Sequence, residues 1–159
     1  MSYPRFGVLL LCGMLALPAA AKERPGELDT RRELQKLGGE LLEIGATFGR
    51  YAAAASSKAS YDLLYEQKEA NEFFFHVYHV RTILDLAMAV EAPDDERTVR
   101  SVLVREANDL VALLDGSIED RPKAKIDLPK PEYVRTIDAF LVKLQQIREA
   151  ARRLAKAED

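Results

Sequence analysis

The sequence has little cysteine and histidine and no tryptophan: its 159 residues include one Cys and two His. Cys12 lies in an N-terminal apolar run that we expect to be removed, so the mature chain should have no disulfide, thiol nucleophile or thiolate metal site. No N-glycosylation acceptor is present, because neither Asn71 nor Asn108 begins an N-x-S/T triplet. The joint absence of both features favours the periplasm of a Gram-negative bacterium over a eukaryotic secretory route.

The chain also lacks the short motifs that mark common catalytic and cofactor sites. Without C-x-x-C-H, covalent c-type haem is excluded. No P-loop, G-x-G-x-x-G, G-x-S-x-G or H-E-x-x-H is present. The formal net charge of −3 gives no reason to expect nucleic acid as a partner. We therefore expect a non-enzymatic protein without a cofactor, and we rank a hydrolase with a site built from scattered residues last.

The N-terminal segment, residues 1–21, has the pattern of a secretory signal peptide. Its uncharged apolar run covers residues 6–17, and Ala19 and Ala21 supply the small residues of an A-x-A cleavage site. A membrane-spanning helix needs about 20 apolar residues, so this run is too short for a stable span. We predict cleavage after Ala21, which leaves residues 22–159 as a single periplasmic or secreted domain.

The rest of the chain shows the apolar spacing of amphipathic helices and no alternating strand pattern. In the first helix the spacing alternates between three and four residues, as in a heptad seam. That seam consists of Leu34, Leu37, Leu41, Ile44, Phe48, Tyr51 and Ala55. Four helices are predicted, over residues 27–55, 58–91, 94–114 and 131–154. With short connections, they predict an all-α, antiparallel, up-down-up-down four-helix bundle.

The third predicted helix is the shortest of the four. Asp94 and Asp95 are expected to cap its start, and Asp115-Gly116 to end it. Residues 116–131 then form one long loop between the third and fourth helices. The second helix has apolar residues beyond its seam, so we expect it to be the most buried.

Small residues form a strip beside the seam of the first helix: Gly38, Gly45, Gly49 and Ala52. Each Gly inside a helix costs about 1 kcal/mol relative to Ala, which suggests a packing reason for the strip. Bulky side chains from residues 73–75 are expected to fill it. The alternatives are a groove for a small ligand and a surface where a second copy packs closely.

Glu72, His76 and His79 share one face of the second helix because they are spaced by four and three residues. A carboxylate and two imidazoles are able to bind a divalent metal and leave positions open for another ligand. The competing interpretation is a half-buried boundary where these side chains form hydrogen bonds or face water. A small-ligand or divalent-metal-binding bundle is therefore the alternative function.

The predicted long loop carries basic residues among acidic ones: Arg121, Lys123, Lys125 and Lys130. Such charges are usually solvated, yet a long loop on a rigid scaffold often forms a binding site. The favoured function is a non-enzymatic periplasmic protein that acts through protein–protein interaction, as an inhibitor, an immunity-type protein or a chaperone-like bundle. A homodimer is compatible with this sequence.

Overall fold

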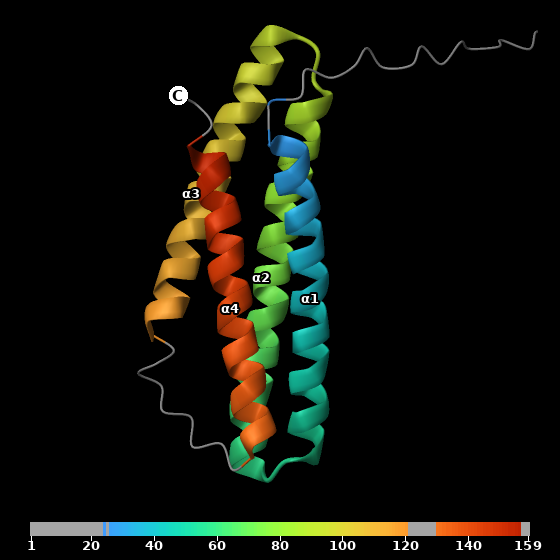
Figure 1. The fold of residues 1–159 in the computed structure, drawn as a ribbon, viewed down its shortest axis with the longest axis vertical. Helices are drawn as coiled ribbons and strands as arrows, with labels where there is room; N and C mark the ends of the chain where they lie inside the picture. Colours follow the sequence, from blue (N-terminus) through green and yellow to red (C-terminus); the bar gives the residue numbers. More distant parts are fainter. Residues whose placement is uncertain (1–23, 25, 121–129, 157–159) are drawn as a thin grey trace, which may run out of the picture.

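The computed structural model describes residues 24, 26–120 and 130–156, and within them the chain forms four helices and no strand (Figure 1). These are α1 (Glu27–Ala54), α2 (Ser57–Ala89), α3 (Pro93–Asp120) and α4 (Pro131–Ala155). The predicted all-α four-helix fold is confirmed. The predicted signal peptide lies outside the described residues. None of the helices in the described ranges is both long enough and apolar enough to cross a membrane.

Helix α3 continues past its predicted end at Leu114 to Asp120, so the prediction that it is the shortest helix was wrong. Asp115 accepts hydrogen bonds from Arg148 and Arg152 of α4, at 3.0 and 3.2 Å. Ser117 donates a 3.4 Å hydrogen bond to Glu69 of α2. These tertiary contacts outweigh the roughly 1 kcal/mol that Gly116 costs inside a helix. The connection to α4 is correspondingly shorter than the predicted loop.

The helix starts also differ from the predicted caps. Because α3 begins at Pro93, Asp94 and Asp95 lie in its first turn and do not cap it. Proline suits a first helical turn, and the carboxylates there face the positive end of the helix dipole. Gly26 precedes α1 with a φ of 87°, a left-handed conformation that favours glycine.

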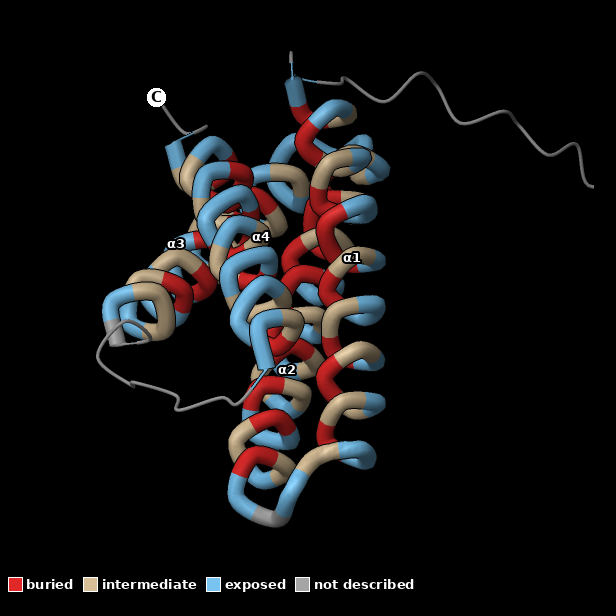
Figure 2. Tube along the Cα trace, turned by 60° about the horizontal axis from the view of Figure 1, so that its bottom comes forward, coloured by how far each residue is buried: buried red, intermediate tan, exposed pale blue. Residues whose placement is uncertain are grey.

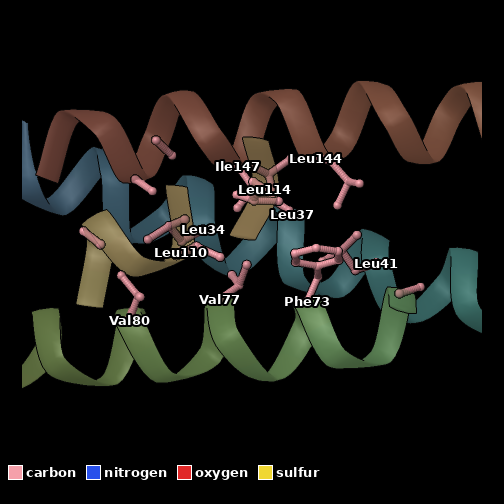
Figure 3. Packing of buried hydrophobic residues seen from close by; sticks show 14 of the residues in the cluster. Leu34, Leu37, Leu41, Phe73, Val77, Val80, Leu110, Leu114, Leu144 and Ile147 are labelled. Atoms are coloured by element: carbon pink, nitrogen blue, oxygen red, sulfur yellow. The ribbon is translucent and has the colours of Figure 1, made fainter. Parts of the chain in front are cut away.

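The core lies between the four helices, where the predicted apolar seams meet (Figure 2). Helix α1 packs most extensively against α2, and α4 contacts both α1 and α3. Figure 3 shows side chains from all four helices in this core. They include Leu37 of α1, Val77 of α2, Leu114 of α3 and Leu144 of α4, all of which are buried. Burial of such side chains stabilises the fold by about 1.5–3 kcal/mol each.

The helix α3 does not reach the end of the bundle where α1 connects to α2 (Figure 1). At that end α1 packs on α4 through ring contacts, Phe48 on Phe140 at 5.9 Å and Tyr51 on Tyr133 at 4.8 Å. Among the residues that the structure describes, this end is therefore built from α1, α2 and α4, and the N-terminal part of α2 is flanked by α1 and α4.

Candidate interaction surface

Large apolar side chains are exposed mainly on α2. Tyr61 is 77% exposed and Phe75 is 66% exposed, although both lie on a helix whose opposite side is in the core. The other three helices together expose only four large apolar side chains in the described residues: Leu42, Leu113, Val134 and Val142. Helix α2 exposes six: Tyr61, Leu64, Tyr65, Phe75, Tyr78 and Leu86. Among the described residues α2 contributes the most buried side chains, as expected, but it also has this exposed apolar set, which the expectation did not include.

These six side chains share one face of α2. Leu64, Phe75 and Leu86 are eleven residues apart, which on a regular helix is a rotation of only about 20° per step. Lys68 and Glu72 lie between them on the same side. We call this surface the α2 outer face; it comprises Tyr61, Leu64, Tyr65, Lys68, Glu72, Phe75, Tyr78, His79 and Leu86. At about 1.5 Å per residue, it runs for roughly 37 Å along the helix.

The α2 outer face has hollows between its side chains. One hollow of about 310 Å³ is lined by Tyr61, Leu64, Tyr65 and Lys68. A second, of about 320 Å³, overlaps the first at Leu64 and Lys68 and extends to Phe75. The first has the spacing i, i+3, i+4, i+7, which forms the hole that accepts a knob in helix–helix packing. Four side chains at this spacing are able to surround a side chain from another helix.

The charged groups of the face are few, and Lys68 and Glu72 pair with each other. Lys68 Nζ lies 3.4 Å from Glu72 Oε1, and the Tyr65 hydroxyl donates to Glu69 at 2.9 Å. The guanidinium of Arg81 stacks 4.8 Å above the Tyr78 ring. Tyrosine side chains that are fixed by such contacts are typical of the central part of protein interfaces.

The glycine strip on α1 fixes how α2 is rotated. A Cβ added to Gly38 would lie 3.7 Å from a carbon of the Phe74 ring. One on Gly45 would lie 3.0 Å from Asn71 Oδ1, and one on Gly49 would lie 2.8 Å from Gln67 Nε2. Side chains of α2 thus occupy the strip, and Ala52 at its end is also buried. Because residues 67, 71 and 74 are directed at α1, the α2 outer face is directed at solvent.

The structure does not bring the three predicted metal ligands together. Glu72 is paired with Lys68, whereas His79 Nε2 lies 3.5 Å from Glu106 Oε2 on α3. The Arg105 hydrogen bond, with a further contribution from His79, lowers the pKa of Glu106 below its ordinary value. His76 is exposed. Within the described ranges, no three His, Asp or Glu side chains lie close enough to hold one metal ion.

Of the predicted partner-binding residues, Arg121, Lys123 and Lys125 lie outside the described residues. Lys130 is exposed at the start of α4, and its Nζ lies 5.5 Å from the ring centre of Tyr133. A docking surface on this segment remains a prediction.

A buried ion cluster joins α1 to α3 and has no counterpart in the sequence motifs. The Arg100 guanidinium donates to Glu27 of α1, and its Nε donates to Glu96 at 2.8 Å. These partners, Glu27 first, raise the pKa of Arg100 above its ordinary value. Glu27 and Arg100 are 73 residues apart, so no local pattern reveals the pair. By linking α3 to the start of α1, the cluster fixes the position of α3 along the bundle axis. We assign it a structural role.

Sequence reasoning also missed the α2 outer face, although one signal was present: α2 has apolar residues beyond a single seam. Comparison of the chain with protein-family models, curated proteins and solved structures found no match. The shape and chemistry of the α2 outer face therefore carry the functional argument.

Proposed function

We propose that this is a non-enzymatic periplasmic protein that binds another protein through the α2 outer face. The observation that carries the proposal is the gathering of six large exposed apolar side chains on one face of one helix. Exposed apolar patches larger than a few hundred Å² usually mark interaction sites. The core needs none of these side chains, because its seams are filled from the other side of α2.

The partner surface that fits this face best is an α-helix. Its long axis, its knob-sized hollows and its rigid aromatic groups match the way an amphipathic helix is recognised along a groove. A specific inhibitor or immunity-type role suits such a defined surface better than a chaperone-like role, which calls for adaptable contacts.

We also infer that the helices run up-down-up-down. The connections at residues 55–56 and 90–92 are too short to return along the bundle, which supports opposite directions for α1, α2 and α3. Arg153 near the end of α4 pairs with Glu33 near the start of α1, which supports the same relation for those two helices. Export to the periplasm is supported by the signal-peptide pattern of residues 1–21.

Photo-crosslinking in cells tests the proposed function. A photoreactive phenylalanine analogue replaces Phe75 in the full-length chain, and a matched variant carries it at Val142, which is also exposed but lies on α4. We expect a crosslinked protein adduct from position 75 and little from position 142. Absence of any protein adduct at position 75, or equal adducts at both positions, would contradict the proposal.

A further inference from the structure

We propose that a second copy of this chain occupies the α2 outer face, in an antiparallel α2–α2 pair whose two-fold axis crosses this face midway between Lys68 and Glu72, at the level of residue 70. The inference rests on the proposed function of this face as a protein-binding surface and names a second copy as its partner, so a target of an inhibitor or immunity-type role would compete with that copy for the face. A two-fold interface brings the same patch of both copies together, so the patch must be complementary to itself. The charges and the shape of the α2 outer face both meet this condition.

The charges are complementary under an antiparallel pairing. A two-fold axis at residue 70 places Lys68 opposite Glu72 of the second copy, and Glu72 opposite Lys68. Each copy also holds these two side chains 3.4 Å apart, so the four charges alternate in sign around the axis. A parallel pair in register would instead place Lys68 against Lys68 and Glu72 against Glu72, which repel. Electrostatics therefore select the antiparallel arrangement.

The shape is complementary under the same pairing. The hollow lined by Tyr61, Leu64, Tyr65 and Lys68 is centred between Leu64 and Tyr65. Its counterpart across the axis is Phe75, the most exposed apolar side chain in the middle of α2. Phe75 of each copy thus enters the hollow of the other as a knob enters a hole. The second hollow, which Lys68 and Glu72 help to line and which extends to Phe75, lies at the two-fold axis. The charged pairs between the two copies form at this hollow.

The area is sufficient for a dimer of modest affinity. The four exposed aromatic side chains of the face offer roughly 400–500 Å² per copy. Complete coverage of these rings in two copies would bury roughly 800–1,000 Å², which is at or just below the lower limit for a specific interface. Leu64 adds to this area. We therefore expect a dissociation constant on the order of micromolar.

Charge reversal tests the pairing by sedimentation of the purified protein. Lys68→Glu alone puts carboxylates opposite carboxylates, and Glu72→Lys alone puts ammonium groups opposite each other. Each is expected to weaken the dimer by about tenfold or more, because two pairs change at once. The double variant Lys68→Glu/Glu72→Lys restores opposite charges and is expected to recover the dimer. A mixture of the two single variants is expected to form a heterodimer more readily than either variant pairs with itself.

Phe75→Asp tests the apolar contact and is expected to leave a monomer. Val142→Asp on α4 is the matched control and is expected to leave the dimer intact. Because all four positions are exposed, the helical circular dichroism and the melting temperature of each variant serve to check that the bundle still folds.

The outcomes separate this inference from the proposed function. A chain that stays monomeric at about 300 µM, while position 75 captures a different protein in cells, would overturn the dimer and retain the proposed function. A dimer insensitive to Phe75→Asp, or one that the double charge variant does not recover, would also overturn the inference. Capture of lipid in place of protein at position 75, with binding to anionic vesicles, would overturn both.

Discussion

Helix α2 has two apolar faces that differ in what covers them. On the inner face Val77 and Leu84 are almost completely buried by the other helices, whereas on the outer face Phe75 and Leu86 are more than half exposed. The residue types are alike, so composition does not distinguish the faces. The difference shows that packing against neighbouring helices, and not residue type, decides which apolar residues of a bundle helix are buried.

The largest expected effect contrasts two leucines on these faces. Leu84→Ala leaves a cavity in the core and is expected to lower the free energy of unfolding by roughly 3–5 kcal/mol. Leu86→Ala, two residues later on the outer face, is expected to change it by less than about 0.5 kcal/mol. Urea unfolding at a concentration low enough to keep the chain monomeric measures both. Equal losses from the two substitutions would contradict the distinction between the faces.

The same contrast extends to charged residues on α3. Arg100→Ala removes the side-chain partner of the buried Glu27 carboxylate, which is left with the backbone N–H of Arg24 at 3.3 Å, and is expected to cost about 2–3 kcal/mol. Arg97 forms only an exposed 4.0 Å pair with Asp94, so Arg97→Ala should cost less than about 0.5 kcal/mol. Thermal unfolding of both variants measures the difference. A larger loss from Arg97→Ala would show that the Arg100 cluster does not anchor α3.

Much of the fold was predictable from local spacing, because Leu34, Leu37 and Leu41 repeat at intervals that only a helix places on one face. The end of α3 was not predictable in this way. Asp115 and Ser117 extend the helix through contacts with residues of α4 and α2 that are distant in the sequence. The spacing of Glu72, His76 and His79 placed them on one helix but did not reveal that Lys68 and Glu106 are the nearby partners of two of them.

The candidate surface was harder to predict than the fold, for a physical reason. Periodicity identifies apolar faces but does not say which of two such faces a neighbouring helix covers. On α2 that choice depends on the glycine strip of α1, which leaves room for the side chains of Asn71 and Gln67. Their contact with the strip sets the rotation of α2 about its own axis.

A test of that rotation uses the same substitution on two sides of α1. Gly45→Leu forces a side chain against Asn71 and Ala70, and we expect a loss of about 1–2 kcal/mol in stability. Gly39 has open space where its Cβ would lie, so Gly39→Leu is expected to gain up to about 0.5 kcal/mol from helix propensity. Chemical denaturation measures both. A stabilising Gly45→Leu would mean that α2 does not fill the strip.

The smallest expected effect concerns Glu106 of α3, which pairs with Arg105 and with His79 at the edge between the two faces of α2. The pKa of this carboxyl is lower in the folded chain than its ordinary value of 4.5. Its contribution to stability is therefore present above pH 4.5 and is lost as the pH falls through the lower, folded-state pKa. Glu106→Gln removes this contribution, so the variant should be slightly less stable than the original chain near pH 7, about equally stable at low pH, and flatter on the acid side of the stability curve. An unchanged acid slope in this variant would contradict the assignment.

Hydroxyl-radical footprinting in intact cells tests most directly whether the α2 outer face is covered in use. Modification of Tyr61, Tyr65 and Phe75 is compared with that of the purified chain at a dilution that prevents self-association, and Leu42 and Leu113 serve as exposed controls. We predict strong protection of the three aromatic residues in cells and unchanged modification of the two leucines. Equal modification of the aromatic residues in both states would contradict a protein-binding role for this face.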